Sequence, residues 1–137
     1  MSSGRYRYYR LNPKEKEVVK GTVKEILKGG GMELTIIFGN FVEMESFRDV
    51  DVAVYADSRE LDLNAVIKLS VELEERLHIP VGVVPLNEGS PSFRHYILTG
   101  GEVVLEKRPG LCEALLMRTL NANARRASSL GERGDLI

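Results

Sequence analysis

Apolar residues recur at helical spacing in three stretches of the chain. In the first, which begins at Pro13, apolar side chains occupy every third or fourth position, lysines lie mostly on the other side, and Gly29 ends the repeat. The same spacing returns in a stretch that ends before Pro80 and in one that follows Pro109. The pattern predicts long helices over Pro13–Lys28, Asp62–Leu77 and Leu111–Ser128, and a short helical turn around Ser92–Leu98.

The apolar positions also predict which face of each helix is buried, because a helix of a globular domain presents such a stripe to the core. In the first helix these positions are Val18, Val19, Thr22, Val23, Ile26 and Leu27. In the second helix they are Leu63, Val66, Ile67, Ser70, Val71 and Leu73, with Glu72, Glu74, Glu75 and Arg76 on the solvent side.

Four short apolar runs between the helices have the composition of strands, because they are rich in β-branched residues. They are Leu34–Phe38, Val50–Tyr55, Val81–Leu86 and Glu102–Glu106. The interleaved order α-β-β-α-β-α-β-α predicts an α+β fold, a small mixed β-sheet with helices packed on it. We expect a single domain over residues 13–130, preceded by a flexible basic and aromatic arm (1–12) and followed by a tail (131–137).

Composition narrows the class of protein without naming a function. The chain has 137 residues, with 19 Lys and Arg against 20 Asp and Glu, as expected for one ordinary domain. Its single cysteine, Cys112, permits no internal disulfide and is interpreted as a packing residue. Because no apolar run is long enough to span a membrane and no secretory signal is visible, we expect a cytoplasmic protein without a membrane partner.

The N-terminal arm is a basic cluster. Residues 1–10 (MSSGRYRYYR) hold three Arg, three Tyr and no acidic residue. Such a segment can stack on bases and contact phosphates, whereas the more common alternative is disorder or docking on a neighbouring subunit. With a net charge of −1, the whole chain has no field that would attract nucleic acid, so nucleic-acid binding is the less favoured interpretation.

Candidate chemistry lies at the ends of the first two predicted strands. One strand ends at Gly39, which allows close backbone approach, and Asn40 opens a short helix whose amides can face a phosphate. Asp49 and Asp51 flank Val50 and share one face of the next strand, because side chains alternate along a strand. Two such carboxylates can hold Mg²⁺ against a triphosphate, which is the arrangement that nucleotidyl transfer requires.

This pattern resembles the minimal nucleotidyltransferases of the polymerase-beta superfamily. Their signature is an apolar strand, Gly-Ser, a spacer and Asp-x-Asp within a second apolar strand. Here the same order is Ile36 to Asn40, the spacer FVEMESFR and Asp49-Val50-Asp51. The resemblance covers roughly Lys14–Arg108, and the stretch Ile79–Glu106, with PLNEGSPSFRHYILTGGEVVLE, is similar to the family's third strand, short helix and closing strand.

The resemblance implies an activity and a partner. Asp49 and Asp51 would be the catalytic and metal-binding residues for Mg²⁺ or Mn²⁺, while Gly39 and Asn40 would bind the nucleotide. The implied reaction transfers a nucleoside monophosphate from a nucleoside triphosphate to a protein or nucleic-acid hydroxyl. The implied partner belongs to the HEPN helical class, towards which such proteins act as antitoxins. The leftover apolar face of the last helix would also allow a homo-oligomer.

The sequence departs from the family signature in three places. Asn40 replaces the family's Ser, although its amide still donates hydrogen bonds. The spacer is shorter and lacks the usual glycine. Gly82 stands where the family commonly has a third carboxylate, which helps to bind a second metal and activates the attacking hydroxyl. Glu88, six residues further along, is a distant substitute.

Three interpretations therefore stay open. The chain is a metal-dependent nucleotidyltransferase, a catalytically degenerate member of the same fold that binds a partner in the manner of an antitoxin, or a nucleic-acid-binding module that uses its basic arm. The Asp-x-Asp motif favours the first, the replacements at Asn40 and Gly82 favour the second, and the arm favours the third.

Overall fold

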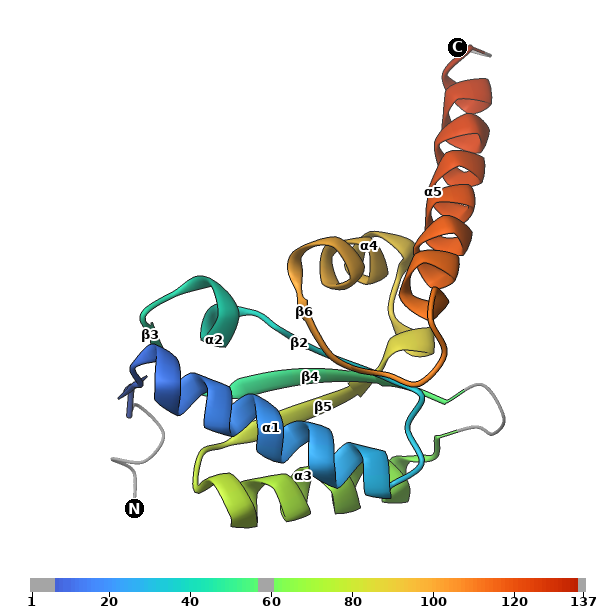
Figure 1. The fold of residues 1–137 in the computed structure, drawn as a ribbon. Coiled ribbons are helices and arrows are strands. Elements are labelled where there is room, and N and C mark those ends of the chain that lie inside the picture. Colours follow the sequence, from blue (N-terminus) through green and yellow to red (C-terminus); the bar gives the residue numbers. More distant parts are fainter. Residues whose placement is uncertain (1–6, 57–60, 136–137) are drawn as a thin grey trace.

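The computed structural model describes residues 7–56 and 61–135, of which 126–135 are described as backbone only. Helices and strands alternate along the chain as predicted (Figure 1). In chain order the elements are β1 (Tyr9–Arg10), α1 (Pro13–Gly29), β2 (Leu34–Phe38), α2 (Asn40–Glu43), β3 (Ser46–Phe47), β4 (Val50–Tyr55), α3 (Leu63–Leu77), β5 (Val81–Pro85), the 3-10 turn η2 (Leu86–Glu88), α4 (Pro91–Gly100), β6 (Glu102–Glu106) and α5 (Leu111–Asp135).

A four-stranded mixed sheet in the order β5-β4-β2-β6 forms the centre of the molecule. Strand β2 pairs antiparallel with β4 and β6, and β4 pairs parallel with β5. The two central strands, β2 and β4, are almost entirely buried, which explains their nearly continuous apolar sequence. The predicted fold class, a small mixed sheet with helices packed on it, is confirmed.

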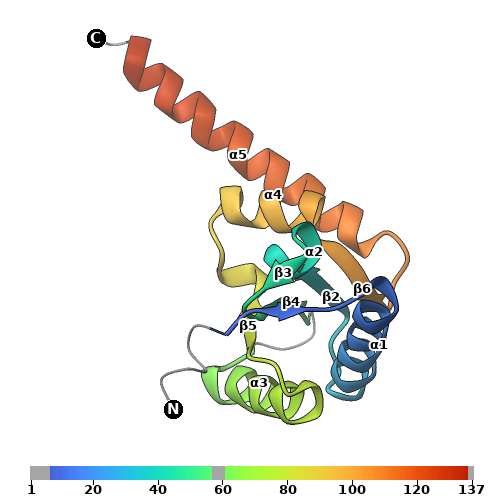
Figure 2. The same cartoon turned by 90° about the vertical axis from the view of Figure 1, so that its left-hand side faces the viewer.

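Helices cover both faces of this sheet (Figures 1 and 2). Helices α1 and α3 lie side by side on one face, which we call the α1/α3 face. Helix α4 and the first turns of α5 cover the other, the α4/α5 face, and the rest of α5 projects away from the domain. Strand β4 contributes to the cores on both faces, because Val52 and Val54 pack with α1 and α3 while Ala53 and Tyr55 pack with α4 and α5.

The sequence supplies the caps at which the helices begin. The Asn12 side chain accepts a hydrogen bond from the Glu15 amide, and the Glu15 carboxylate accepts one from the Asn12 amide, which makes a capping box at the start of α1. Asp62 caps α3 through the Ala65 amide, and Ser90 caps α4 ahead of a proline. These local signals explain why the predicted helix starts are close to the observed ones.

The predicted buried face of α3 is partly wrong. Val66 and Leu73 are buried as expected, but Leu63, Ile67 and Val71 are 73%, 51% and 47% exposed. Leu69, which the prediction missed, is buried instead. Helix α3 carries two apolar rows, and only the one that faces α1 and the sheet is covered. Val18 of α1, which was also predicted to be buried, is exposed as well.

Both ends of the chain differ from the predicted arm and tail. Within the arm, β1 pairs antiparallel with β3, and the Tyr9 ring stacks on Phe47 with ring centroids 6.0 Å apart, so this part of the arm docks on its own domain. Residues 1–6 lie outside the described residues. Helix α5 continues past Ser128 to Asp135, so most of the predicted tail is helical. No helix within the described ranges is long and apolar enough to cross a membrane.

Candidate active site

Asp51 lies at the centre of the candidate site. Strand β4 places it opposite Phe38 of β2 on one side and Gly82 of β5 on the other. Alternation along β4 directs its side chain to the α4/α5 face, the face to which Ala53 and Tyr55 contribute. The carboxylate therefore sits between two strands at the end of the sheet where β2 leads into α2.

Gly39 packs directly against this carboxylate. A Cβ atom built on Gly39 would lie 2.7 Å from Asp51 Oδ2, so the Asp51 carboxylate would have to shift, and the Gly39 φ angle of +82° also favours glycine. The Gly39 carbonyl accepts hydrogen bonds from the Val42 and Glu43 amides and so begins α2. The short helix opened by Asn40 is confirmed, with the Asn40 side chain exposed to solvent.

The two aspartates carry negative charge that the described protein does not neutralise. Asp51 is half-buried, and burial first and the neighbouring Asp49 second raise its pKa to about 6. The described ion pairs join Lys20 to two glutamates and Arg108 to Glu33, and none of them involves either aspartate. A half-buried carboxylate beside a like charge is destabilising unless a cation shares the site.

Gly82 leaves an open position beside the pair. A Cβ on Gly82 would lie 3.3 Å from Asp51 Oδ1, so a side chain at this position would point at the carboxylate. No cluster of three or more His, Cys, Asp or Glu suited to a metal occurs among the described residues. Glu88 does not fill the gap, because it follows the far end of β5, on the order of 10 Å along the strand at about 3.3 Å per residue.

An aromatic group next to the carboxylates was missed by sequence reasoning. The Phe38 ring contacts Phe93 and Tyr96 of α4 edge-on, with centroids 5.7 and 6.3 Å apart. The Tyr96 hydroxyl donates a hydrogen bond of 2.7 Å to Glu43 Oε2 of α2. The spacing of Phe93 and Tyr96 within one short helix is visible in the sequence, but the contact with Glu43 is not, because it depends on how α4 folds over β2.

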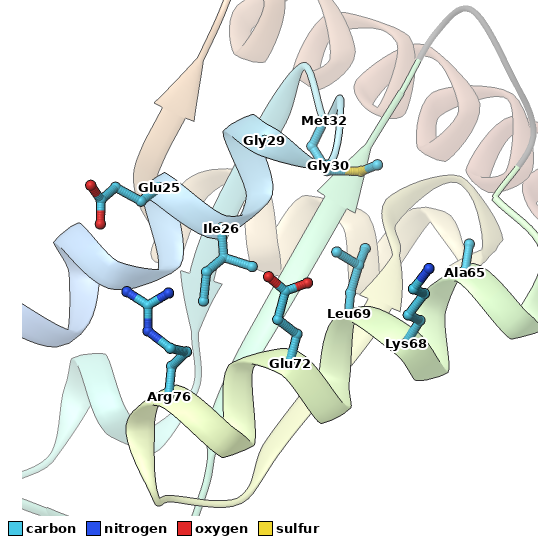
Figure 3. A pocket seen from close by; sticks show the side chains of 10 residues that line it. All are labelled: Glu25, Ile26, Gly29, Gly30, Met32, Ala65, Lys68, Leu69, Glu72 and Arg76. Atoms are coloured by element: carbon cyan, nitrogen blue, oxygen red, sulfur yellow. The ribbon is translucent and has the colours of Figure 1, made fainter.

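A separate cavity of about 710 Å³ opens between α1 and α3 (Figure 3). Its walls carry acidic side chains, Glu25 and Glu72, and basic ones, Lys68 and Arg76. It lies on the α1/α3 face, and neither aspartate lines it. The candidate chemistry is therefore on the opposite face of the sheet from this cavity.

Solved structures share the fold. A toxin-antitoxin complex, MntA-HepT, matches with a TM-score of 0.70 and 21% identity over 88% of this chain and 97% of that chain. A Shewanella oneidensis complex of a tri-AMPylated HEPN toxin with an MNT antitoxin matches with a TM-score of 0.71 and 20% identity over 88% and 98%. A toxin-antitoxin structure with AMP-PNP matches with a TM-score of 0.72 and 21% identity over 85% and 97%.

The sequence itself matches a family model. No curated protein sequence matches the chain significantly. The model described as "Polymerase beta, Nucleotidyltransferase" matches residues 21–109, more than half of the chain. That range contains Gly39, Asn40, Asp49, Asp51 and Gly82, so the resemblance drawn from the sequence is confirmed. The chain belongs to the polymerase beta nucleotidyltransferase family.

Proposed function

We propose that this protein is a metal-dependent nucleotidyltransferase that transfers a nucleoside monophosphate from a nucleoside triphosphate to a hydroxyl group of a HEPN-type helical partner, in the manner of an antitoxin. The observation that carries the proposal is the half-buried Asp51 carboxylate beside Gly39, with the charge of Asp49 nearby and no ion pair to either aspartate among the described residues.

The donor set fits a hard divalent cation. Mg²⁺ is commonly bound by one or two carboxylates together with substrate phosphates, so two aspartates suffice for a nucleotide-bound Mg²⁺ or Mn²⁺. The cation would supply neutralisation of the triphosphate charge. Asp49 and Asp51 would hold it, Gly39 leaves room next to Asp51, and the exposed Asn40 can donate its side-chain amide to a phosphate oxygen.

The partner and the nucleotide class are supported by the similar structures. They include complexes of MNT antitoxins with HEPN toxins, one with a tri-AMPylated toxin and another with AMP-PNP. Because the fold is shared along nearly their whole chains, we expect a HEPN-type partner here and test adenine nucleotides first.

A second candidate function is supported by Gly82. With no side chain at this position, the site lacks the carboxylate that activates the acceptor in the resembled family. The alternative is therefore a degenerate nucleotidyltransferase fold that controls its partner by binding alone. The two candidates differ in one respect, since only the first requires the charge of Asp51.

The deciding experiment measures transfer of label from [α-³²P]ATP to a co-expressed HEPN-type partner in the presence of Mg²⁺ or Mn²⁺. Asp51→Asn removes the charge while preserving size, and we expect at least a hundred-fold loss of transfer, since it removes half of the carboxylate pair. Asp62→Asn is the matched control, because Asn caps a helix as well as Asp does and α3 lies on the other face of the sheet from α4 (Figure 1).

The second candidate makes the opposite prediction for the same proteins. If the wild-type chain binds its partner and transfers no label with any nucleoside triphosphate, transfer is excluded and the binding function is supported. Gly82→Asp sharpens this result, because a carboxylate at position 82 would point at Asp51 and supply the missing group. Transfer that appears only in Gly82→Asp would identify the natural chain as a degenerate enzyme.

A further inference from the structure

A second polar pair lies on the same face of the sheet as the carboxylates. Tyr96 of α4 and Glu43 of α2 meet across 53 residues of sequence, with the hydroxyl donating to Glu43 Oε2 at 2.7 Å. Tyr96 and Glu43 belong neither to the hydrophobic core nor to the pair of aspartates. Because the Tyr96 side chain is 41% exposed, its hydroxyl is open to a molecule bound at this face.

Three observations connect Tyr96 to the candidate active site. The Tyr96 ring packs edge-on against Phe38, whose cross-strand partner is Asp51. Glu43 belongs to the short helix that begins at Gly39, and Gly39 touches Asp51. The charge of Asp51 also contributes to raising the pKa of Tyr96, after the larger effects of the Glu43 hydrogen bond and of burial. Tyr96 is therefore within electrostatic range of Asp51.

Tyr96 and Glu43 have the chemistry of a nucleotide acceptor and of the general base that removes its proton. A phenol that is protonated at neutral pH attacks phosphorus only if its proton is removed, and a carboxylate within hydrogen-bond reach can accept that proton. Glu43 Oε2 already accepts a hydrogen bond from the Tyr96 hydroxyl, so it is placed to receive that proton. Gly82 provides no side chain that could act as the base at this site. Glu43 is a carboxylate that already contacts a hydroxyl group there.

The other described tyrosines lack this combination. Tyr55 is 3% exposed and lies in the core. Tyr9 stacks on Phe47 in the β1–β3 sheet, and Tyr8 lies under the Arg48 guanidinium at the same end of the chain. Among the described residues, Tyr96 is the tyrosine whose hydroxyl is both exposed and hydrogen-bonded to a carboxylate next to the aspartate pair.

We propose that Tyr96 is itself a nucleotide acceptor, so that the protein nucleotidylates its own α4 helix, with Glu43 as the proton acceptor. This inference rests on the proposed function. The Tyr96 oxygen forms a bond to the α-phosphorus of the nucleoside triphosphate, the bond from that phosphorus to the bridging oxygen breaks, pyrophosphate leaves, and the phenolic proton passes to the Glu43 carboxylate. The products are a tyrosyl nucleoside monophosphate ester and pyrophosphate.

Self-modification would place a charged nucleotide on the rim of the site that produced it. The added phosphodiester is negative and would lie within range of Asp51, so it would disfavour binding of a second triphosphate. We therefore expect the modified chain to bind nucleotide more weakly than the unmodified one. In this way Tyr96 would make transfer self-limiting.

The test incubates the purified full-length chain with [α-³²P]ATP and Mg²⁺ or Mn²⁺ and follows the label by intact mass and peptide mapping. We expect one nucleoside monophosphate per chain on the peptide that carries Tyr96. Tyr96→Phe, which removes only the hydroxyl, should lose the label, whereas Tyr8→Phe should retain it. Glu43→Gln should slow labelling at least ten-fold, and Glu45→Gln, two residues away, should not.

A metal-free measurement checks the pair independently of activity. Ultraviolet titration of the tyrosines should show a lower pKa for Tyr96 in Glu43→Gln than in the wild-type chain, because the hydrogen bond to a charged carboxylate is lost. Circular dichroism of each variant shows whether it is folded. Glu43→Gln keeps Tyr96 intact, so the proposal remains testable if Tyr96→Phe does not fold.

The outcomes separate this inference from the proposed function. Label transfer to the HEPN-type partner with an unmodified Tyr96 overturns the inference and leaves the function standing. Label on another residue of the chain, or label on Tyr96 that persists in Asp51→Asn, also overturns it. Absence of nucleotide binding in a thermal-shift assay overturns both. Label on Tyr96 that requires Asp51 and is slowed by Glu43→Gln supports both.

Discussion

The two faces of the central sheet use the same strands for different purposes. On the α1/α3 face, which we call the closed face, side chains such as Val52 and Val54 are buried beneath two helices. On the α4/α5 face, which we call the open face, the apolar core contains Ala53 and Tyr55. Asp51, at one end of this face, is only half-buried. Because side chains alternate, β4 stabilises the fold through one face and presents a carboxylate from the other.

This difference shows how a small domain can tolerate an unfavourable charge. The closed face and the apolar part of the open face supply hydrophobic stabilisation, which scales with the apolar area removed from water. The carboxylate pair reduces the stability of the folded chain, as the raised pKa of Asp51 indicates. We expect variants on the closed face to change stability alone, and variants at the carboxylate end to change ligand binding as well.

The largest effect on stability is expected from Leu73→Ala on the closed face. Leu73 is fully buried between α3 and the sheet, so truncation removes apolar contacts and leaves a cavity. We expect a loss of about 3 kcal/mol in the free energy of unfolding, measured by urea denaturation. Leu63→Ala is the matched control on the same helix, and its 73% exposed side chain should cost less than about 1 kcal/mol. Equal losses would show that the exposed row of α3 is covered in solution.

Gly39→Ala should combine a moderate loss of stability with a loss of ligand binding. The new Cβ would meet Asp51 Oδ2 at 2.7 Å, and the backbone would be held at a φ angle of +82°. We expect a loss of about 2 kcal/mol in thermal or urea unfolding, together with loss of the metal-dependent nucleotide shift. Gly21→Ala, where nothing lies within 4 Å of the new Cβ, is the control and should be neutral or stabilising. An unchanged nucleotide shift in Gly39→Ala would contradict the proposed site.

The pH dependence of stability should carry a signature of Asp51. Its pKa rises from 3.8 in the unfolded chain to about 6 in the fold, so the folded state binds the proton more tightly. The contribution of Asp51 to metal-free stability, taken as the difference between wild type and Asp51→Asn, should therefore increase as pH falls from about 7 to 4, by on the order of 1 kcal/mol after allowance for solvent screening. Asp51→Asn should remove this contribution and be the more stable protein at pH 7. A wild-type profile that parallels the Asp51→Asn profile would refute the assignment.

The smallest effect is expected at a polar residue on the closed face. Thr35 is fully buried, and its hydroxyl has no hydrogen-bond partner among the described residues. Thr35→Val replaces the hydroxyl with a methyl group of similar size and should stabilise the fold by about 0.5–1 kcal/mol in urea denaturation. Its effect on nucleotide binding should be nil, in contrast to Gly39→Ala. A destabilised Thr35→Val variant would indicate that the hydroxyl has a partner in solution.

Local patterns predicted most of the elements but not all of their surroundings. The strands that contain Ile36 and Val52 were predicted within one residue because their apolar runs end at turn residues. Helix α3 was predicted within one residue of its observed ends, but the exposure of Ile67 was not, because two apolar rows fit the same spacing. The two-residue strands β1 and β3 have no periodicity to detect, and their pairing joins Tyr9 to Phe47, which is distant in the sequence.

The sequence by itself determined the fold class, the helix starts and the face of β4 on which Asp51 lies, since these depend on residue spacing and side-chain alternation. The resemblance to a family pointed to Gly82, and the parallel pairing of β4 with β5 places it opposite Asp51. Tertiary structure alone decided that Tyr96 reaches Glu43, because that contact joins helices far apart in the chain. Spacing encodes neighbours along one element, whereas contacts between elements depend on how the whole sheet is covered.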